Sequence, residues 1–267
     1  MSFIYRKVSD LLEWVDTNGD PRLKETWLMG SPWPVFIILI AYLYFVLKAG
    51  PEFMKSRKAI NIDRIVMVYN VVQVLFSLYI LKEEFRLLWI PGNYRLICIE
   101  IDNSDTYMAK EKLFVVWFYF FSKVLDLLDT IFFILRKKQN QVTFLHIYHH
   151  AMVLTFSWGI LRFYPGGQIA FFGTINAFVH VVMYTYYFLT VLKPEYKQAW
   201  WKKYLTQLQL IQFVATGIHG LAGLFAANCS YPKSIVLLTL TQDVFMFFLF
   251  WDFYKKAYMK PIKNKNT

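Results

Sequence analysis

The sequence lacks several patterns that identify common classes of protein. It has no glycine-rich phosphate-binding loop, no low-complexity segment and no obvious internal repeat. Its 29 Lys and Arg residues exceed its 18 Asp and Glu residues and give a net charge of +11. They are scattered through loops and form no stripe with interleaved aromatics, which argues against nucleic-acid binding. Residues 1–30 lack the apolar core and small-residue cleavage site of a signal peptide, so we expect the first span to direct insertion.

Long apolar runs are abundant instead. Hydrophobic residues make up 57% of the 267 positions and aromatic residues 20%, whereas soluble domains are roughly 45–50% apolar. A helix needs about 20 residues to cross the hydrocarbon core. We therefore predict one all-α, polytopic membrane domain over residues 1–267, with seven spans at 33–48, 63–81, 113–135, 143–161, 167–191, 205–226 and 235–254. A short interfacial helix before the first span is suggested by Leu11, Leu12, Trp14 and Val15.

Basic residues are distributed unevenly between the two sides of these spans. The short connection after the third span contains Arg136 to Lys138, whereas the one after the fourth contains only Arg162. Because Lys and Arg favour the cytosolic side, we predict a cytosolic C-terminus and an N-terminus on the far side. Cys98 and Cys229 both fall on that far side, where a disulfide between them and two unpaired thiols are the alternatives.

Three of the five histidines cluster at the start of the fourth predicted span. The spacing of His146, His149 and His150 places all three on one helical face. Polar side chains inside a span are costly, and by default they mark a functional site. Metal ligation, proton relay and nucleophilic attack are the candidate chemistries.

Polar residues also line other spans. Lys123, Asp126 and Thr130 share a face of the third span, with Asp129 at its edge. A self-neutralised network that only fixes helix packing is the alternative reading. Further stripes are Asn176, His180, Tyr184 and Tyr187, then Gln209, Gln212, Thr216 and His219, then Gln242 and Asp243. One stripe could serve only helix association, but stripes on successive spans predict an enclosed polar cavity.

Such a cavity could hold a metal or support acyl transfer. The HxxHH spacing is similar to that of membrane di-iron desaturases and hydroxylases, but those enzymes have several histidine boxes. The five histidines here could still supply four ligands for one zinc. Neutral imidazole is a nucleophile near pH 7, and neighbouring His, Asn, Gln and Tyr side chains could act as acid, base or oxyanion donors. We favour acyl transfer from a thioester, with a metal-dependent lipid oxidase as the closest alternative.

Four runs in a fixed order resemble the signatures of the ELO family of very-long-chain fatty acid elongases. They are Lys123 to Thr130, Gln141 to His150, Asn176 to Tyr187 and Thr206 to Gln212. Asp126 stands where the family often has Glu, which preserves the charge and shortens the reach.

The resemblance implies a 3-oxoacyl-CoA synthase of the endoplasmic reticulum membrane. Such an enzyme condenses a long-chain acyl-CoA with malonyl-CoA, releases CO₂ and CoA, and needs no metal or other cofactor. Six spans would form an inverted barrel around a closed acyl tunnel, with the first span outside and CoA entering from the cytosol. Membrane lipid, other enzymes of the elongation cycle and a second copy of the chain are the implied partners, and nucleic acid is not.

The resemblance also carries residue roles. His149 matches the acyl acceptor and His180 its partner at the reacting carbonyl, while His146 and His150 complete the box. The candidate catalytic residues are His149, His180, His146, His150, Lys123, Asp129 and Asn176. The candidate substrate-binding residues are Asp126, Tyr184, Tyr187, Gln209, Gln212, Thr216, His219, Arg136, Lys137 and Lys203.

Two other classes of membrane protein and two short sequence motifs were also considered. A seven-span receptor does not need histidine boxes, and a transporter often has Gly or Pro breaks at mid-span, whereas proline here lies almost wholly at span ends. Lys263 and Lys265 resemble a dilysine retrieval signal of the endoplasmic reticulum, or form only a basic tail. The glycosylation sequon at Asn228 lies so near the predicted membrane that we do not expect its use.

Overall fold

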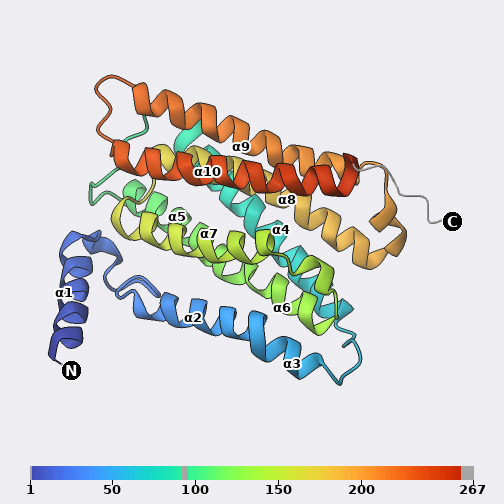
Figure 1. Cartoon of the computed structure of the whole chain (residues 1–267). Helices are drawn as coiled ribbons and strands as arrows, with labels where there is room; N and C mark the ends of the chain where they lie inside the picture. The colour runs from blue at the N-terminus through green and yellow to red at the C-terminus, as the bar shows by residue number, and fades with distance from the viewer. Residues whose placement is uncertain (1, 92–95, 260–267) are drawn as a thin grey trace. The chain divides into compact units, whose positions relative to one another are not determined.

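The apolar runs of the sequence fold into helices (Figure 1). The computed structural model describes residues 2–91 and 96–259. The helices are α1 (Ser2–Asn18), α2 (Trp33–Tyr44), α3 (Gly50–Met54), α4 (Asp63–Glu84), α5 (Tyr107–Asp126), α6 (Leu128–Leu135), α7 (Phe144–Phe163), α8 (Ala170–Leu192), α9 (Lys202–Phe225) and α10 (Lys233–Tyr254). Five-residue π-helical turns extend α2, α4 and α10, at Phe45–Ala49, Phe85–Trp89 and Lys255–Met259.

Within the described residues, five helical segments are long and apolar enough to cross a membrane, which makes this a multi-pass membrane protein. They are Trp33–Met54, Asp63–Trp89, Gly167–Leu192, Lys202–Phe225 and Lys233–Met259. The predicted spans 113–135 and 143–161 are also helical but are not among the five. The first is divided at Leu127 into α5 and α6, and α7 carries the three clustered histidines. Seven spans and their barrel arrangement therefore stay predictions.

The chain groups into two compact units, each built from two separate stretches. The first unit comprises Met1–Ile62 and Ile101–Gly167, and the second comprises Asp63–Glu100 and Gln168–Thr267. The prediction of a single domain over the whole chain stays a prediction.

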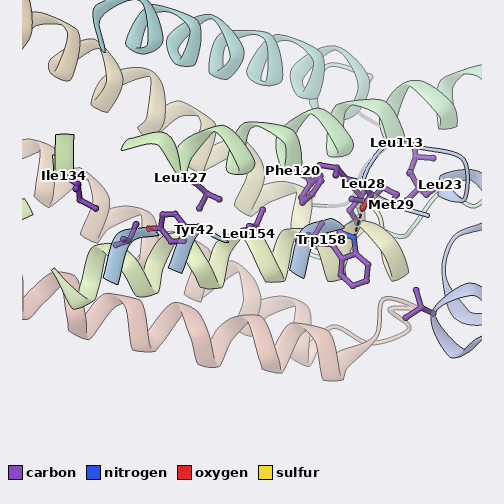
Figure 2. Close-up of a cluster of buried hydrophobic side chains, with 14 of the residues drawn as sticks. Leu23, Leu28, Met29, Tyr42, Leu113, Phe120, Leu127, Ile134, Leu154 and Trp158 are labelled. Atoms are coloured by element: carbon purple, nitrogen blue, oxygen red, sulfur yellow. Dashed lines mark hydrogen bonds between the residues drawn. The ribbon is translucent and has the colours of Figure 1, made fainter. Parts of the chain in front are cut away.

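In the first unit, α7 packs against α2 and α5, and α6 packs against α3. Its core contains Tyr42, Phe120, Leu154 and Trp158, all buried (Figure 2). The indole nitrogen of Trp158 donates to the carbonyl of Leu28 over 3.0 Å, so this large side chain is packed without losing its polar contact. Because lipid tails are as apolar as leucine, such a cluster stabilises membrane helices chiefly by close packing.

In the second unit, α4 packs against α8, α8 against α9, and α9 against α10. A disulfide joins Cys98, in the connection after α4, to Cys229, between α9 and α10. Next to it, the side chain of Gln168 accepts from the backbone N–H of Ile99 over 3.1 Å. The covalent bond and the hydrogen bond hold the two connections of this unit at the same end.

A buried arginine fastens the N-terminal helix to the rest of the first unit. Arg162, at the end of α7, is 0% exposed. Its guanidinium donates to the carbonyls of Asp20 over 2.7 Å and of Val15 over 3.1 Å, which caps the last turn of α1. A Cβ added at Gly19 would lie 2.3 Å from Cζ of Arg162, so only glycine fits at position 19.

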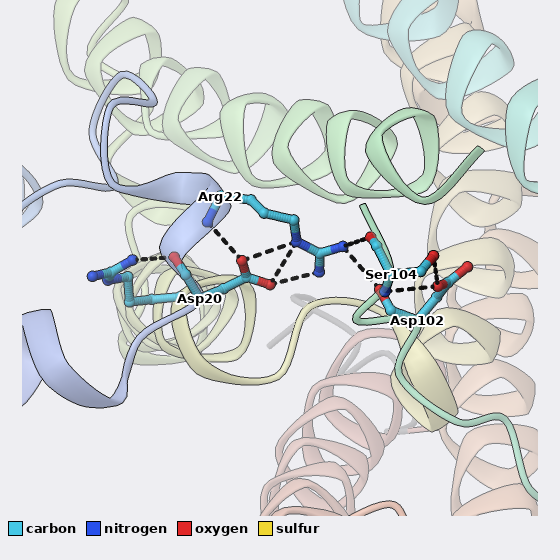
Figure 3. Close-up of polar contacts among 5 residues, drawn as sticks. Asp20, Arg22, Asp102 and Ser104 are labelled. Atoms are coloured by element: carbon cyan, nitrogen blue, oxygen red, sulfur yellow. Dashed lines mark hydrogen bonds and ion pairs between the residues drawn. The ribbon is translucent and has the colours of Figure 1, made fainter. Parts of the chain in front are cut away.

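The segment after α1 is held by a second arginine. Arg22 forms an ion pair with the carboxylate of Asp20 at 2.6 Å and donates to the carbonyls of Asp102 and Ser104 at 3.0 and 2.9 Å (Figure 3). These bonds connect the two separated stretches of the first unit directly.

Replacing Arg162 by Met should destabilise the protein by roughly 2–4 kcal/mol, because two buried hydrogen bonds from a charged donor are lost. The measurement is thermal unfolding of the purified protein in detergent. Arg6→Met, at an exposed position of α1, is the matched control and should leave the midpoint unchanged. An Arg162→Met midpoint equal to that of the control would show that the buried contact adds no stability.

Candidate functional site

The polar residues predicted for the third span lie where α5 gives way to α6. Lys123 and Asp126 are both buried, and their Nζ and Oδ2 atoms form an ion pair of 3.2 Å. The Lys123 ammonium also lies 4.6 Å from the centre of the Tyr119 ring, within cation–π range. Asp129 occupies the first turn of α6, where the helix dipole favours a negative charge. The predicted lysine–carboxylate pairing thus involves Asp126.

The three clustered histidines lie in the first two turns of α7. Thr143 caps the helix by accepting from the backbone N–H of His146 over 3.3 Å. The rings of His146 and His150 have centroids 4.3 Å apart, and those of His149 and His150 are 5.3 Å apart. The single helical face predicted from the spacing thus gathers three imidazoles, with the ring of His150 next to those of His146 and His149.

A chain of hydroxyl groups orients the first of these rings. The Thr130 hydroxyl on α6 lies 2.9 Å from Nε2 of His146, and the Tyr42 hydroxyl on α2 lies 2.8 Å from Thr130. Both Lys123 and Asp126 interact electrostatically with His149. The first unit therefore assembles a nucleophile candidate, neighbouring bases and a charged pair from α2, α5, α6 and α7.

A second polar group lies along α8 in the second unit. Asn176, His180 and Tyr184 are buried, and the rings of His180 and Tyr184 lie 5.5 Å apart. Tyr184 also contacts α4, where the Tyr69 hydroxyl is 3.4 Å from its own. The half-buried ring of Tyr187 lies 5.9 Å from that of Tyr184.

The predicted residues of α9 have separate surroundings. Gln209 contacts the sulfur of Met183 on α8 at 3.6 Å, and Gln212 is buried. Thr216 donates to Asp243 of α10 over 2.8 Å, and His219 stacks on Phe171 with centroids 4.1 Å apart. A small cavity of about 30 Å³ is lined by Gln168, Thr216, His219, Tyr231 and Asp243 among others. Its lining is mostly apolar but includes these polar side chains, and it is large enough to accommodate a water molecule.

The remaining predicted residues lie at the ends of helices or beyond the described chain. Arg136 caps α6 and is half-buried, and Lys137 is exposed, with a left-handed φ of 54° in the tight connection to α7. Lys203 is exposed in the first turn of α9, in the second unit. Lys263 and Lys265 lie outside the described residues.

We did not predict a polar stripe on α4 from the sequence. Asn70, Gln73, Ser77 and Glu84 are all buried. Their spacing of three, four and seven residues is a helical signal that could have been recognised. Glu84 accepts from the hydroxyl of Thr174 on α8, which in turn accepts from the indole of Trp89 over 3.1 Å.

The clustered side chains do not form an evident metal site. Within residues 2–91 and 96–259, no group of three or more His, Cys, Asp or Glu side chains is placed to hold a metal ion. The absence of a metal cofactor nevertheless stays a prediction, which metal removal can test.

Known proteins match this chain over nearly its whole length. The sequence profile of the ELO: GNS1/SUR4 family matches residues 27–266. A very long chain fatty acid elongase of Aedes aegypti is 39% identical over 268 residues, which is 100% of this chain and 74% of that protein. Very long chain fatty acid elongase 4 is 39% identical in Mus musculus, over 99% of this chain and 84% of the relative, and 40% identical in Homo sapiens, over 96% and 81%.

Replacing Thr130 by Val should remove both hydroxyl contacts while preserving the shape of the side chain. Because the Tyr42 hydroxyl, on a side chain only 4% exposed, would lose its partner, we expect a loss of about 1–3 kcal/mol in the free energy of unfolding. Thr155→Val, which removes only a bond to the carbonyl of Ala151 in α7, is the control. Equal unfolding midpoints for the two variants would contradict a structural role for this relay.

Proposed function

The chain belongs to the ELO (GNS1/SUR4) family, whose compared members are very long chain fatty acid elongases, and from this premise we propose that it catalyses the condensing step of elongation. It joins a long-chain acyl-CoA to malonyl-CoA and forms a 3-oxoacyl-CoA two carbons longer, with release of CO₂ and CoA. The observation that carries the proposal is that the ring of His150 lies next to those of His146 and His149, in a unit where the Lys123–Asp126 pair acts electrostatically on His149.

In the first half-reaction, His149 attacks the carbonyl carbon of the acyl thioester. A nitrogen–carbon bond forms and the carbon–sulfur bond breaks. The proton of the imidazole passes to the departing thiolate, which is released as free CoA. His150, whose ring centroid lies 5.3 Å from that of His149 and 4.3 Å from that of His146, is proposed to help pass that proton together with His146. Thr130 and Tyr42 hold the His146 ring in orientation, so they act as positioning residues.

In the second half-reaction, malonyl-CoA loses CO₂ and becomes an enolate. Its carbon attacks the acyl-imidazole, the nitrogen–carbon bond breaks, and the departing imidazole takes up a proton. Asn176, His180 and Gln209 are the proposed donors to the oxyanions of this step. The contribution of Asp129 to the charge around the site is also part of the proposal.

The other assignments follow from substrate chemistry. CoA carries phosphates, which Lys and Arg bind well, so Arg136, Lys137 and Lys203 are proposed to bind it. Asp126, Tyr184, Tyr187, Gln212, Thr216 and His219 are proposed to contact the bound substrates. The enzyme is proposed to act in the endoplasmic reticulum membrane with its N-terminus lumenal, alongside membrane lipid, other enzymes of the cycle and a second copy of the chain.

The acyl-imidazole can be trapped. Incubation with acyl-CoA alone should release CoA and leave a peptide acylated at His149, detected by mass spectrometry. His149→Ala and His149→Gln should abolish both signals. His146→Asn should slow CoA release by about 10²-fold, because it removes only a residue that assists proton transfer. Thermal unfolding separates misfolded variants from inactive ones. Acylation that persists at the same level in folded His149→Gln would contradict the assignment of His149 as the acyl acceptor.

Metal removal tests the closest rival, a metal-dependent desaturase or hydroxylase. Prolonged dialysis against chelators should leave the rate of condensation unchanged, because every step above uses side chains of the chain itself. Elemental analysis before and after dialysis confirms that metal was removed. A rate that falls with the metal content and returns on adding back one particular ion would favour the rival.

A further inference from the structure

The N-terminal helix α1 has an apolar side and a charged side. The apolar side is formed by Tyr5, Val8, Leu11, Leu12 and Val15, and the opposite side by Arg6, Asp10 and Glu13. This separation along 17 residues is typical of a helix that lies between an apolar and an aqueous medium.

Part of this apolar side is exposed. Val8 and Leu12 are half-buried and Val15 is 4% exposed, but Leu11 is 46% and Tyr5 78% exposed. Trp14, beside this side, is 54% exposed, and its ring packs against Phe163 of α7 at a centroid distance of 5.1 Å. The arc is therefore available to a partner along the half of α1 that leads away from Val15.

The anchoring of α1 sets its level relative to the membrane helices. Its last turn is bound by Arg162 at the end of α7, and the start of α2, a candidate span, is tied to α7 through Leu28 and Trp158. Figure 1 shows α1 lying crosswise to α2 and α7 at this end of the first unit. Exposed tryptophans occur on α1, on the segment that follows it and at the start of α2, at positions 14, 27 and 33, and tryptophan is enriched at membrane–water interfaces.

We propose that α1 is an interfacial helix that lies in the plane of the bilayer surface, with Tyr5, Leu11 and Trp14 against lipid at the headgroup–acyl boundary. Lipid is the occupant because the last turn of α1 is bound at the end of α7, to which the chain just ahead of α2, a candidate span, is also tied. The apolar side chains Phe36, Ile37 and Ile40 of α2 are 38, 64 and 65% exposed, and a membrane span turns such a surface to lipid. The proposal is independent of the reaction proposed for the histidines.

Spin labelling of the full-length protein in lipid nanodiscs tests the placement. Both native cysteines are in the disulfide, so single added cysteines can be labelled selectively. Leu11→Cys probes the apolar arc, Glu13→Cys is the matched position on the charged side, and Ile37→Cys is the lipid-facing reference on α2. Accessibility to oxygen, which concentrates in lipid, is compared with accessibility to a water-soluble nickel chelate.

The Leu11 label should favour oxygen over the chelate, as the Ile37 label does, while the Glu13 label shows the reverse preference. Equal access of the chelate to the Leu11 and Glu13 labels would place α1 in water and overturn the proposal. Dipolar broadening between Leu11 labels of two copies, or exclusion of both reagents, would identify a protein contact and overturn it as well.

Discussion

A lysine buried in a membrane-inserted bundle requires a partner within reach, and the first unit is arranged around that requirement. Asp126 supplies the charge one turn from Lys123, and the helix breaks immediately afterwards at Leu127. The break starts α6, which brings Thr130 to His146. Breaking a buried pair of this kind by removing one partner costs about 3–5 kcal/mol. The ion pair thus fixes the geometry on which the imidazole cluster depends.

The two units satisfy their buried polar groups in different ways. The first relies on an ion pair and a hydroxyl relay that ends on a histidine ring. The second uses ring contacts and hydroxyl–carboxyl pairs across neighbouring helices, such as Thr216 with Asp243 and Thr174 with Glu84. The charged pair and the imidazole cluster therefore belong to the first unit, and these hydroxyl–carboxyl pairs belong to the second.

Helical periodicity made much of this predictable. The faces carrying His146, His149 and His150, and Asn176, His180 and Tyr184, follow from spacing alone, and five of the predicted spans coincide with apolar helices. The division at Leu127 carries no glycine or proline signal, so it was missed. The burial of Arg162 was missed as well, because its partners lie more than 140 residues away in the sequence, among the carbonyls of α1. The α4 stripe was also missed, although its helical spacing is visible in the sequence.

The interleaving of the units has a consequence for biosynthesis. The second stretch of the first unit is complete once residue 167 is made, whereas the second unit needs residues close to the C-terminus. The helix α4, with Asn70, Gln73 and Glu84, is therefore synthesised well before α8 exists to receive it. Cys98 likewise waits through 131 positions for Cys229. During translation, polar side chains of α4 must be sheltered by the insertion machinery or by water until the last helices arrive, which makes the newly made chain most vulnerable to quality control at that stage.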